Sequence, residues 1–215
     1  MKNNSYWIFG KHAVKAAIFN QYRIIKRILL DQNNKSSHVD INNSLKKTKR
    51  ELSIEYVSRE VLENYVGKRN KHQGIAIEVN KLEILPYDEI FKNVNFKVGV
   101  FLEKITDPNN AGSIYRSALG FNLDFVIGLE NGNIKENTSL VNNACGAFDK
   151  INTYKAINSV SCIKKFKSNN WWVIGADMYG SVNINQALKN YNKNDKFLIF
   201  IGSEGTGLKR LTKKN

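Results

Sequence analysis

The sequence predicts an α/β fold in which helices cover both faces of a parallel sheet. Two observations support this class: helical and strand periods alternate along the chain with short loops between them, and several strands are continuous apolar runs. A third observation is that Asp107–Ser117 and Ile201–Arg210, which are rich in Asn, Arg, Glu and Gly, each lie where a strand turns into a helix. Open α/β sheets build their sites at such places.

The first half of the chain is predicted to alternate short strands with helices. The expected strands are Tyr6–Phe9, Ile25–Asp31, Ser53–Val57 and Gly74–Val79, and the expected helices are His12–Phe19, Val39–Glu51 and Arg59–Val66. The segment Lys81–Asn95, which holds Pro86 and has mixed polarity, is the best candidate for a boundary. We therefore expect a domain over residues 1–80, a linker over 81–95 and a second domain over 96–215.

The second half opens with an apolar strand, Val98–Glu103, that runs toward Asp107 and Pro108. Because proline disfavours helix in the residue before it, Asn109 or Asn110 is expected to cap a helix over Ala111–Leu119. The further strands expected are Asp124–Leu129, Ile151–Tyr154, Trp172–Ala176 and Phe197–Gly202, with helices near Ser139–Ala147, Val160–Ser168 and Asn183–Asn190. Apolar strands that alternate with helices imply a parallel sheet.

The composition fits a folded, soluble protein: 42% of the 215 residues are hydrophobic and 11% are aromatic. No run approaches the roughly 20 apolar residues that span a bilayer, and Met1–Ser5 lacks the apolar centre of a signal peptide. A cytoplasmic protein without membrane contact is expected. Cys145 and Cys162 have neither the spacing of a metal site nor that of a redox pair, so both are expected to be inert core thiols.

A formal net charge of +14 points to a polyanionic partner, and nucleic acid is the class expected. Part of the charge can be without function, because the abundance of Lys, Asn and Ile is also what an AT-rich genome would yield. Lys46–Arg50 and Lys68–His72 are plausible phosphate contacts, although a solvated face explains each equally well. His12 and His72 are expected to be structural or to face RNA, since neither accompanies a nucleophile or a ligand cluster.

The segment around Asn110 and Arg116 allows two interpretations. Arg116 lies about one and a half turns into its helix, so its side chain can reach back over the helix N-terminus and bind an anion there. Alternatively, Asn110 only caps the helix and Arg116 is a solvated surface residue. Taken alone, the segment favours the second interpretation, because capping Asn residues are common.

The segment Gly202–Gly207 combines closely spaced glycines with a carboxylate, Glu204, at a strand end. Such glycines let a backbone approach a ligand. The segment lacks the Lys-Ser/Thr pair of a phosphate loop and does not match the dinucleotide fingerprint. The α/β pattern would also suit a dinucleotide-dependent oxidoreductase, but this chain lacks the motif of that class.

Together, the two segments resemble those of the SpoU/TrmH branch of the SPOUT methyltransferases, which transfer a methyl group from S-adenosylmethionine to a ribose 2′-oxygen in RNA. The nearest group is the 23S-rRNA type with an extra N-terminal domain. The resemblance covers most of the chain. Its segments are Trp7–Val14, His72–Ile75, Ile105–Ala118, Ala144–Ala147 and Ile201–Gly205.

By this resemblance Asn110, Arg116 and Glu204 form the reaction centre, Gly202 and Ala176 lie at the cofactor, and no metal is required. Arg116 is the residue that the family usually assigns to activating the ribose hydroxyl. A plain general-base role conflicts with the chemistry of a guanidinium, which keeps its protons in proteins. We therefore expect Arg116 to bind the adjacent RNA phosphate and to orient the 2′-oxygen, with proton loss late in the transfer.

The resemblance also implies a small ribosomal-protein-like α/β domain that recognises RNA, followed by a SPOUT α/β-knot domain. RNA is the implied partner, with rRNA favoured over tRNA, and a homodimer is implied for the intact fold. The family continues past Leu208–Thr212 into a final helix that completes the knot and the cofactor pocket, so the fold is expected to be C-terminally incomplete at Asn215. Two functions stay open: an RNA 2′-O-ribose methyltransferase, or a catalytically inactive RNA-binding remnant of one. Binding of S-adenosylmethionine separates them.

Overall fold

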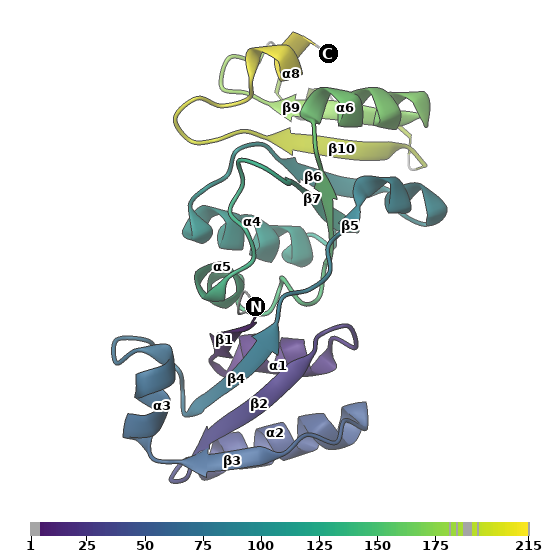
Figure 1. Ribbon diagram of the computed structural model, residues 1–215. Coiled ribbons are helices and arrows are strands. Elements are labelled where there is room, and N and C mark those ends of the chain that lie inside the picture. The colour runs from purple at the N-terminus through teal and green to yellow at the C-terminus, as the bar shows by residue number, and fades with distance from the viewer. Residues whose placement is uncertain (1–4, 181, 184, 187–190, 193, 215) are drawn as a thin grey trace. The chain divides into compact units, whose positions relative to one another are not determined.

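The computed structural model describes residues 5–180, 182–183, 185–186, 191–192 and 194–214. The chain forms two compact units (Figure 1). The first combines Met1–Glu83 with Lys135–Lys150, and the second combines Ile84–Ile134 with Ile151–Asn215. Most of the helix predicted over Asn183–Asn190 lies outside the described residues. No helix within the described ranges is both long and apolar enough to cross a membrane.

The first unit is built on a sheet of four strands in the order β1-β4-β2-β3. The strands are β1 (Ser5–Phe9), β2 (Ile25–Asp31), β3 (Ile54–Val57) and β4 (Ile75–Asn80). Strand β4 is antiparallel to β1 and β2, whereas β3 pairs with β2 in parallel. Because successive side chains alternate between the faces of a sheet and both faces are apolar, each face needs a cover.

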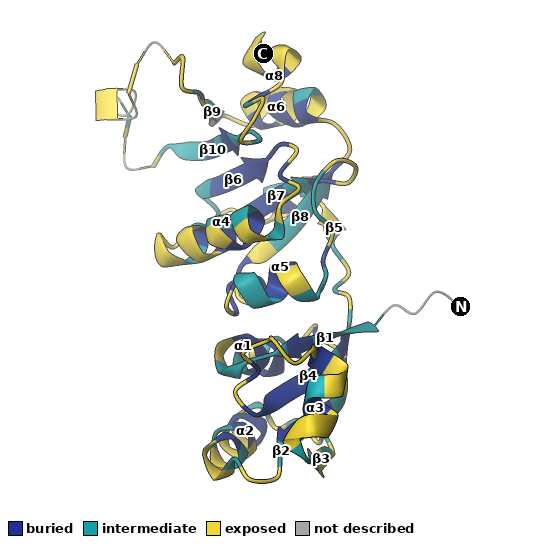
Figure 2. Cartoon of the chain, turned by 90° about the vertical axis from the view of Figure 1, so that its left-hand side faces the viewer, coloured by how far each residue is buried: buried dark blue, intermediate teal, exposed yellow. Residues whose placement is uncertain are grey.

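Helices supply that cover (Figure 2). They are α1 (Lys11–Phe19) and α2 (Lys35–Thr48) on one face, and α3 (Arg59–Val66) on the other. Under α3, Leu62 packs against Leu29 and Ala76. Helix α2 begins four residues before the predicted Val39 because the Asn34 side chain caps it by accepting the N–H of Ser37.

The segment Lys135–Lys150, which carries α5 (Thr138–Asn143), is held in the first unit by a buried ionic cluster. The fully buried Arg23 donates from Nε to Asp149 Oδ1 at 2.8 Å and forms a short bond from Nη1 to Glu136. Tyr6 also donates its hydroxyl to Glu136, and burial raises the pKa of Tyr6. Burial lowers the pKa of Arg23, but the two carboxylates outweigh that effect and leave it raised.

The second unit is a sheet of six parallel strands in the order β5-β8-β7-β6-β10-β9, which confirms the predicted α/β class. The strands are β5 (Leu85–Pro86), β6 (Val98–Leu102), β7 (Phe125–Leu129), β8 (Asn152–Ala156), β9 (Trp171–Ala176) and β10 (Lys196–Ile201). Every neighbouring pair in this sheet is parallel.

Helices cover the two faces of this sheet. They are α4 (Pro108–Gly120), α6 (Ser159–Ser168), the short α8 (Arg210–Lys214) and the 3-10 helix η1 (Tyr87–Lys92). Under α6 and η1, Phe166 joins Phe101, Phe125 and Trp171 in an aromatic core. Gly99 permits this packing, because a Cβ there would lie 2.0 Å from the Phe125 ring.

The segment 81–95, predicted as a linker, contributes to the second unit. Residues 85–92 form β5 and η1, and Ile90 of η1 is fully buried in the core. Tyr87 and Phe91 pack beside it, since positions three and four apart share one side of a helical turn. The domain boundaries predicted at residues 80 and 96 stay a prediction.

The two cysteines differ in exposure. Cys162 is buried in the core of the second unit, and burial raises the pKa of its thiol. Cys145 is exposed, so the prediction that it is a core thiol is wrong. The chain turns at Cys145 with a φ of 50°. Gly146 then approaches Ala16 so closely that a Cβ at Gly146 would lie 2.8 Å from the Ala16 side chain.

Candidate functional site

The strand order of the second unit reverses between β6 and β10. The chain runs from β6 through β7 to β8 on one side, whereas β9 and β10 lie on the other. Leu102 pairs with Ile201, so the two strands end level with each other. Ligands of open α/β sheets bind outside the carboxyl ends of strands at such a switch point. Both segments that the sequence singled out leave the sheet here.

The first segment opens α4, and its cap differs from the prediction. Asp107 is the N-cap and accepts the N–H of Asn109 at 2.8 Å, while Pro108 occupies the first turn. The prediction that Asn109 or Asn110 caps a helix starting at Ala111 is therefore wrong. Aspartate caps as well as asparagine does, and proline suits the first helical position. The amide of Asn110 is not needed as a cap.

Asn110 instead meets the second segment. Its Nδ2 donates to Glu204 Oε1 at 2.5 Å, although the two residues lie 94 positions apart in the sequence. Because a carboxylate only accepts, the amide nitrogen must face Glu204, and Asn110 Oδ1 remains as an acceptor. Within the part of the chain that the structure describes, Oδ1 accepts no hydrogen bond. The structure thus brings together two of the three residues expected at the reaction centre.

Arg116, the third residue, lies on the exposed side of α4. Its neighbour Tyr115 is buried and accepts a hydrogen bond from Thr153 Oγ1 at 3.2 Å, which fixes the rotation of the helix. Arg116 follows Asn110 by six residues, about 9 Å along the axis, and helical side chains lean toward the N-terminus. Its catalytic role stays a prediction.

The loop after β10 closes tightly on itself at Gly202. A Cβ there would lie 2.2 Å from the backbone of Gly207, so no side chain fits. Inside the loop, Gly207 N donates to Ser203 O at 2.8 Å, and the hydroxyls of Ser203 and Thr206 lie 2.7 Å apart. The close packing of the loop is thus sufficient to explain a glycine at position 202. The contact of Gly202 with a cofactor stays a prediction. Glu204 is exposed on this loop.

Sequence reasoning missed Glu103. It was expected only as the last residue of a strand, yet it is fully buried and accepts three hydrogen bonds. A charged residue directly after an apolar strand and only four residues before the Asp107 cap was the available signal. It is the residue that follows β6 at the switch point.

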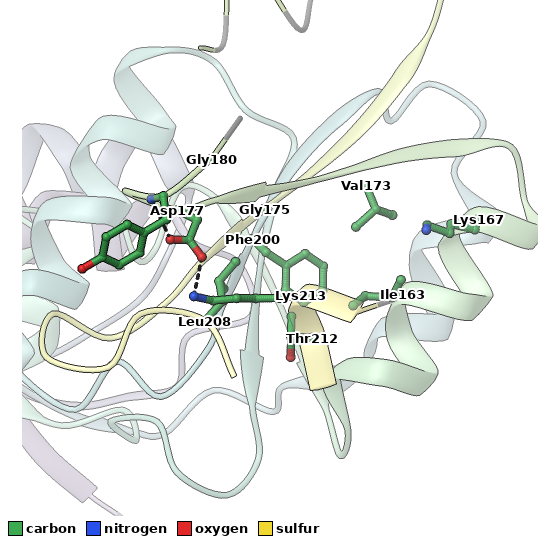
Figure 3. A pocket seen from close by; sticks show the side chains of 11 residues that line it. Ile163, Lys167, Val173, Gly175, Asp177, Gly180, Phe200, Leu208, Thr212 and Lys213 are labelled. Carbon is green, nitrogen blue, oxygen red and sulfur yellow. Dashed lines mark hydrogen bonds and ion pairs between the residues drawn. The ribbon is translucent and has the colours of Figure 1, made fainter. Parts of the chain in front are cut away.

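A pocket of about 270 Å³ is lined by residues of β9, β10, α6 and α8 and of the segments that follow β9 and β10 (Figure 3). Val173, Phe200 and Leu208 line it with apolar surface, and Asp177 and Lys213 form an ion pair of 2.5 Å among its lining residues. The Lys213 ammonium, helped by the Tyr179 N–H, holds the pKa of Asp177 below its usual range. Ala176, expected near the cofactor, lies between the lining residues Gly175 and Asp177 and is exposed.

The structure places the two histidines that the sequence analysis considered. His72 is buried and its Nδ1 accepts the N–H of Gly74 at 3.1 Å, which is a structural role. His12 is exposed at the start of α1. Among the described residues, no group of three or more His, Cys, Asp or Glu side chains is arranged to hold a metal ion.

Two family models match the chain. The model of the SpoU rRNA methylase family matches residues 97–215, and the model described as RNA 2′-O ribose methyltransferase substrate binding matches residues 7–85. Similar curated proteins are described as TrmH family tRNA/rRNA methyltransferases. One from Staphylococcus haemolyticus is 28% identical over 210 residues, which cover 96% of this chain and 81% of the relative. One from Staphylococcus aureus strain COL is 28% identical over 209 residues, or 95% and 81%.

Solved structures share the fold over almost the whole chain. An rRNA methyltransferase from Sinorhizobium meliloti, solved with AdoMet, has a TM-score of 0.75 at 19% identity and covers 100% of this chain and 76% of its own. The SpoU methyltransferase AviRb from Streptomyces viridochromogenes, also solved with AdoMet, has a TM-score of 0.76 at 17% identity, covering 98% and 78%.

Proposed function

The chain belongs to the SpoU rRNA methylase family, and on that premise we propose that it transfers the methyl group of S-adenosylmethionine to a ribose 2′-hydroxyl of RNA. Membership makes it an RNA methyltransferase; the acceptor atom and the residue roles are the proposal. The observation that carries it is the hydrogen bond between Asn110 and Glu204 at the switch point, with Arg116 on the helix that Asn110 opens.

The residues near the switch point fit the cofactor. The apolar lining of Val173, Phe200 and Leu208 suits an adenosine, while Asp177 and Lys213 offer a carboxylate and an ammonium to an amino acid moiety. We also place Ala176, the last residue of β9, and Gly202, the residue after β10, at the cofactor. When bound, S-adenosylmethionine supplies a methyl group on a sulfonium, which is already activated for transfer.

Asn110 and Arg116 align the acceptor. Glu204 fixes the amide of Asn110, so that Asn110 Oδ1 can accept the hydrogen bond of the ribose 2′-hydroxyl and turn an oxygen lone pair toward the methyl group. Arg116 binds the adjacent phosphate with its guanidinium fork. Bound S-adenosylmethionine would supply the methyl group, the 2′-oxygen that Asn110 and Arg116 orient would accept it, and the hydroxyl proton would leave late to water. Alignment supplies much of the acceleration.

The RNA-binding surface that we propose lies on the first unit, at the edge where α1 and α2 begin. The loop with Lys68, Arg69 and Lys71 is fixed there, because Gln73 Oε1 accepts the N–H of Lys11 at 2.9 Å and Gln73 O accepts from Asn34 Nδ2 at 3.0 Å. The three basic side chains are exposed, and no described acidic group pairs with them. A fixed basic loop loses little entropy when it binds phosphates.

Replacing Lys68, Arg69 and Lys71 together by alanine is expected to weaken RNA binding by about tenfold or more. The slope of log affinity against log salt should fall by about two to three, because each lost phosphate contact removes about one unit or slightly less. Titrations of labelled RNA at several salt concentrations measure both quantities.

The matched control replaces Lys26, Lys46 and Lys47 by alanine. These exposed lysines lie where β2 begins and α2 ends, at the opposite edge of the unit, and their loss changes the net charge equally. The control should change the salt slope by less than half as much as the first variant does, and it should keep most of the RNA affinity. Equal losses in the two variants would show that only the overall charge matters.

Three finer features stay predictions: rRNA as the substrate in preference to tRNA and a homodimer, which the resemblance implies, and a cytoplasmic location, which the composition suggests. Incubation of the full chain with labelled S-adenosylmethionine and RNA tests the proposed function directly. Label in the RNA is the expected result. RNA binding without cofactor uptake or transfer would contradict the proposal and would indicate a catalytically inactive RNA-binding protein.

A further inference from the structure

We infer that Glu103 is a positioning residue that holds the loop 202–208 closed, so that Glu204 meets Asn110. The consequence for methyl transfer rests on the proposed function, but the effect on the loop does not. Glu103 directly follows β6, and the loop directly follows the neighbouring strand β10.

Both ends of the loop are held by this one residue. Where the loop leaves β10, the backbone N–H of Glu103 donates to Ile201 O at 2.8 Å. Where the loop returns, Glu103 Oε2 accepts the backbone N–H of Lys209 at 2.8 Å. The backbone bond continues the pairing of two strands and needs no particular side chain, whereas the bond to Lys209 depends on the carboxylate.

The second carboxylate oxygen of Glu103 accepts hydrogen bonds from residues of two helices. Glu103 Oε1 accepts from Ser159 Oγ at 2.5 Å and from Thr212 Oγ1 at 2.7 Å. Ser159 opens α6, and Thr212 lies in α8, which directly follows the loop. Each oxygen of the carboxylate is therefore satisfied, and Thr212 and Lys209 together anchor the returning end of the loop.

The stability of the fold alone does not explain a buried Glu103, because burying a carboxylate costs free energy of folding. The residue is fully buried, and within the described ranges it forms no ion pair with Lys, Arg or His. Neutral donors and the N-terminal turn of α6 offset the desolvation of a carboxylate only in part. An apolar residue would fill the same place after an apolar strand at lower cost, so a functional reason for Glu103 is the better explanation.

Holding the two ends determines where Glu204 lies. The loop is stiff in itself, because Gly202 and Gly207 close its neck and Ser203 bonds to Thr206. A stiff loop moves as one body about its ends. If the returning end comes loose, the whole loop swings, and Glu204 loses its hydrogen bond to Asn110.

Two pairs of variants test the inference by amide hydrogen exchange of residues 203–209, measured without cofactor and without RNA. Glu103→Leu removes all three side-chain bonds and should speed exchange by about tenfold or more. Glu103→Gln should restore most of the protection, because its amide oxygen can face Lys209 N while its nitrogen donates to the hydroxyls.

Thr212→Val and Ser159→Ala are the matched pair. If Glu103→Leu does not fold, these two variants test whether Glu103 holds the loop closed. Each removes one hydroxyl that donates to the same oxygen, so each should lower the unfolding midpoint by a similar amount. Only Thr212→Val should loosen residues 203–209, because only Thr212 adjoins the loop. Equal exchange in the two variants would mean that Glu103 is merely structural and would overturn the inference.

Methyl transfer in the same variants gives a second readout. Transfer should fall with the loss of protection, so that Thr212→Val is slower than Ser159→Ala. Slower transfer with unchanged exchange would mean that Thr212 acts directly from the pocket and would overturn the role of Glu103. If the original chain transfers no methyl group at all, the proposed function fails, while the exchange data still test the loop.

Discussion

Replacing Arg116 by alanine should slow methyl transfer by roughly 100-fold to 1,000-fold at saturating RNA and S-adenosylmethionine. The guanidinium fork is expected to hold the phosphate beside the acceptor ribose, and its loss lets the 2′-oxygen drift from the line of attack. Single-turnover rates with purified RNA measure the effect. A chain that still binds both partners but transfers slowly is the expected result.

Arg116→Lys separates alignment from charge. Lysine keeps the positive charge but lacks the planar fork, so RNA affinity and its salt dependence should stay close to those of the original chain while the transfer rate falls. The rate should also keep its dependence on pH, because Arg116 is proposed to orient the acceptor and not to take up its proton. A pH profile that shifts in Arg116→Lys would instead support a direct role in proton removal.

Replacing Arg23 by leucine should destabilise the first unit by about 3 to 5 kcal/mol, because it leaves two buried carboxylates without their cation. Arg23 is fully buried, and Glu136 and Asp149 are each 8% exposed. Both carboxylates belong to Lys135–Lys150, so this segment should detach first. Urea unfolding of the full chain, together with amide exchange of β1 and β4, measures the loss.

Arg27→Leu is the matched control for Arg23. Arg27 also forms two hydrogen bonds to a carboxylate, that of Glu55, but both side chains are partly exposed. Exposed pairs of this kind contribute about 1 kcal/mol or less, to which its contacts with the rings of Trp7 and Tyr65 add a similar amount. An Arg23 variant that loses no more stability than the Arg27 variant would show that the buried cluster does not hold the unit together.

Most elements of the fold could be predicted from local periodicity, as Ile25–Asp31 and Arg59–Val66 show by matching β2 and α3 from end to end. Errors arose where a polar residue starts an element. Asp107 and Asn34 cap helices that begin before their first apolar residues, and periodicity alone does not register such caps. The segment Lys135–Lys150 belongs to the first unit because of contacts between residues far apart in the sequence, and no local sequence pattern reveals such contacts.

In the candidate site, too, some residues could be predicted from local patterns and others depend on contacts between distant segments. Asn110 and Glu204 could be singled out because each follows a strand end, and the parallel pairing of β6 with β10 explains why they meet. The place of Glu103 after an apolar strand could have drawn attention to it, but its role could not be predicted, because its partners Ser159, Lys209 and Thr212 come from distant segments and carry no motif. The wrong expectation for Cys145 concerns a turn whose next residue, Gly146, packs against Ala16, a contact between residues far apart in the sequence.

The most direct test of the central claim is to locate the transferred methyl group. RNA is methylated by the full chain with labelled S-adenosylmethionine and then hydrolysed in alkali, which cuts only where a free 2′-hydroxyl can attack the adjacent phosphate. The account predicts that the label remains in alkali-resistant dinucleotides and that Asn110→Ala abolishes it. Label released in mononucleotides that carry a methylated base would contradict the account.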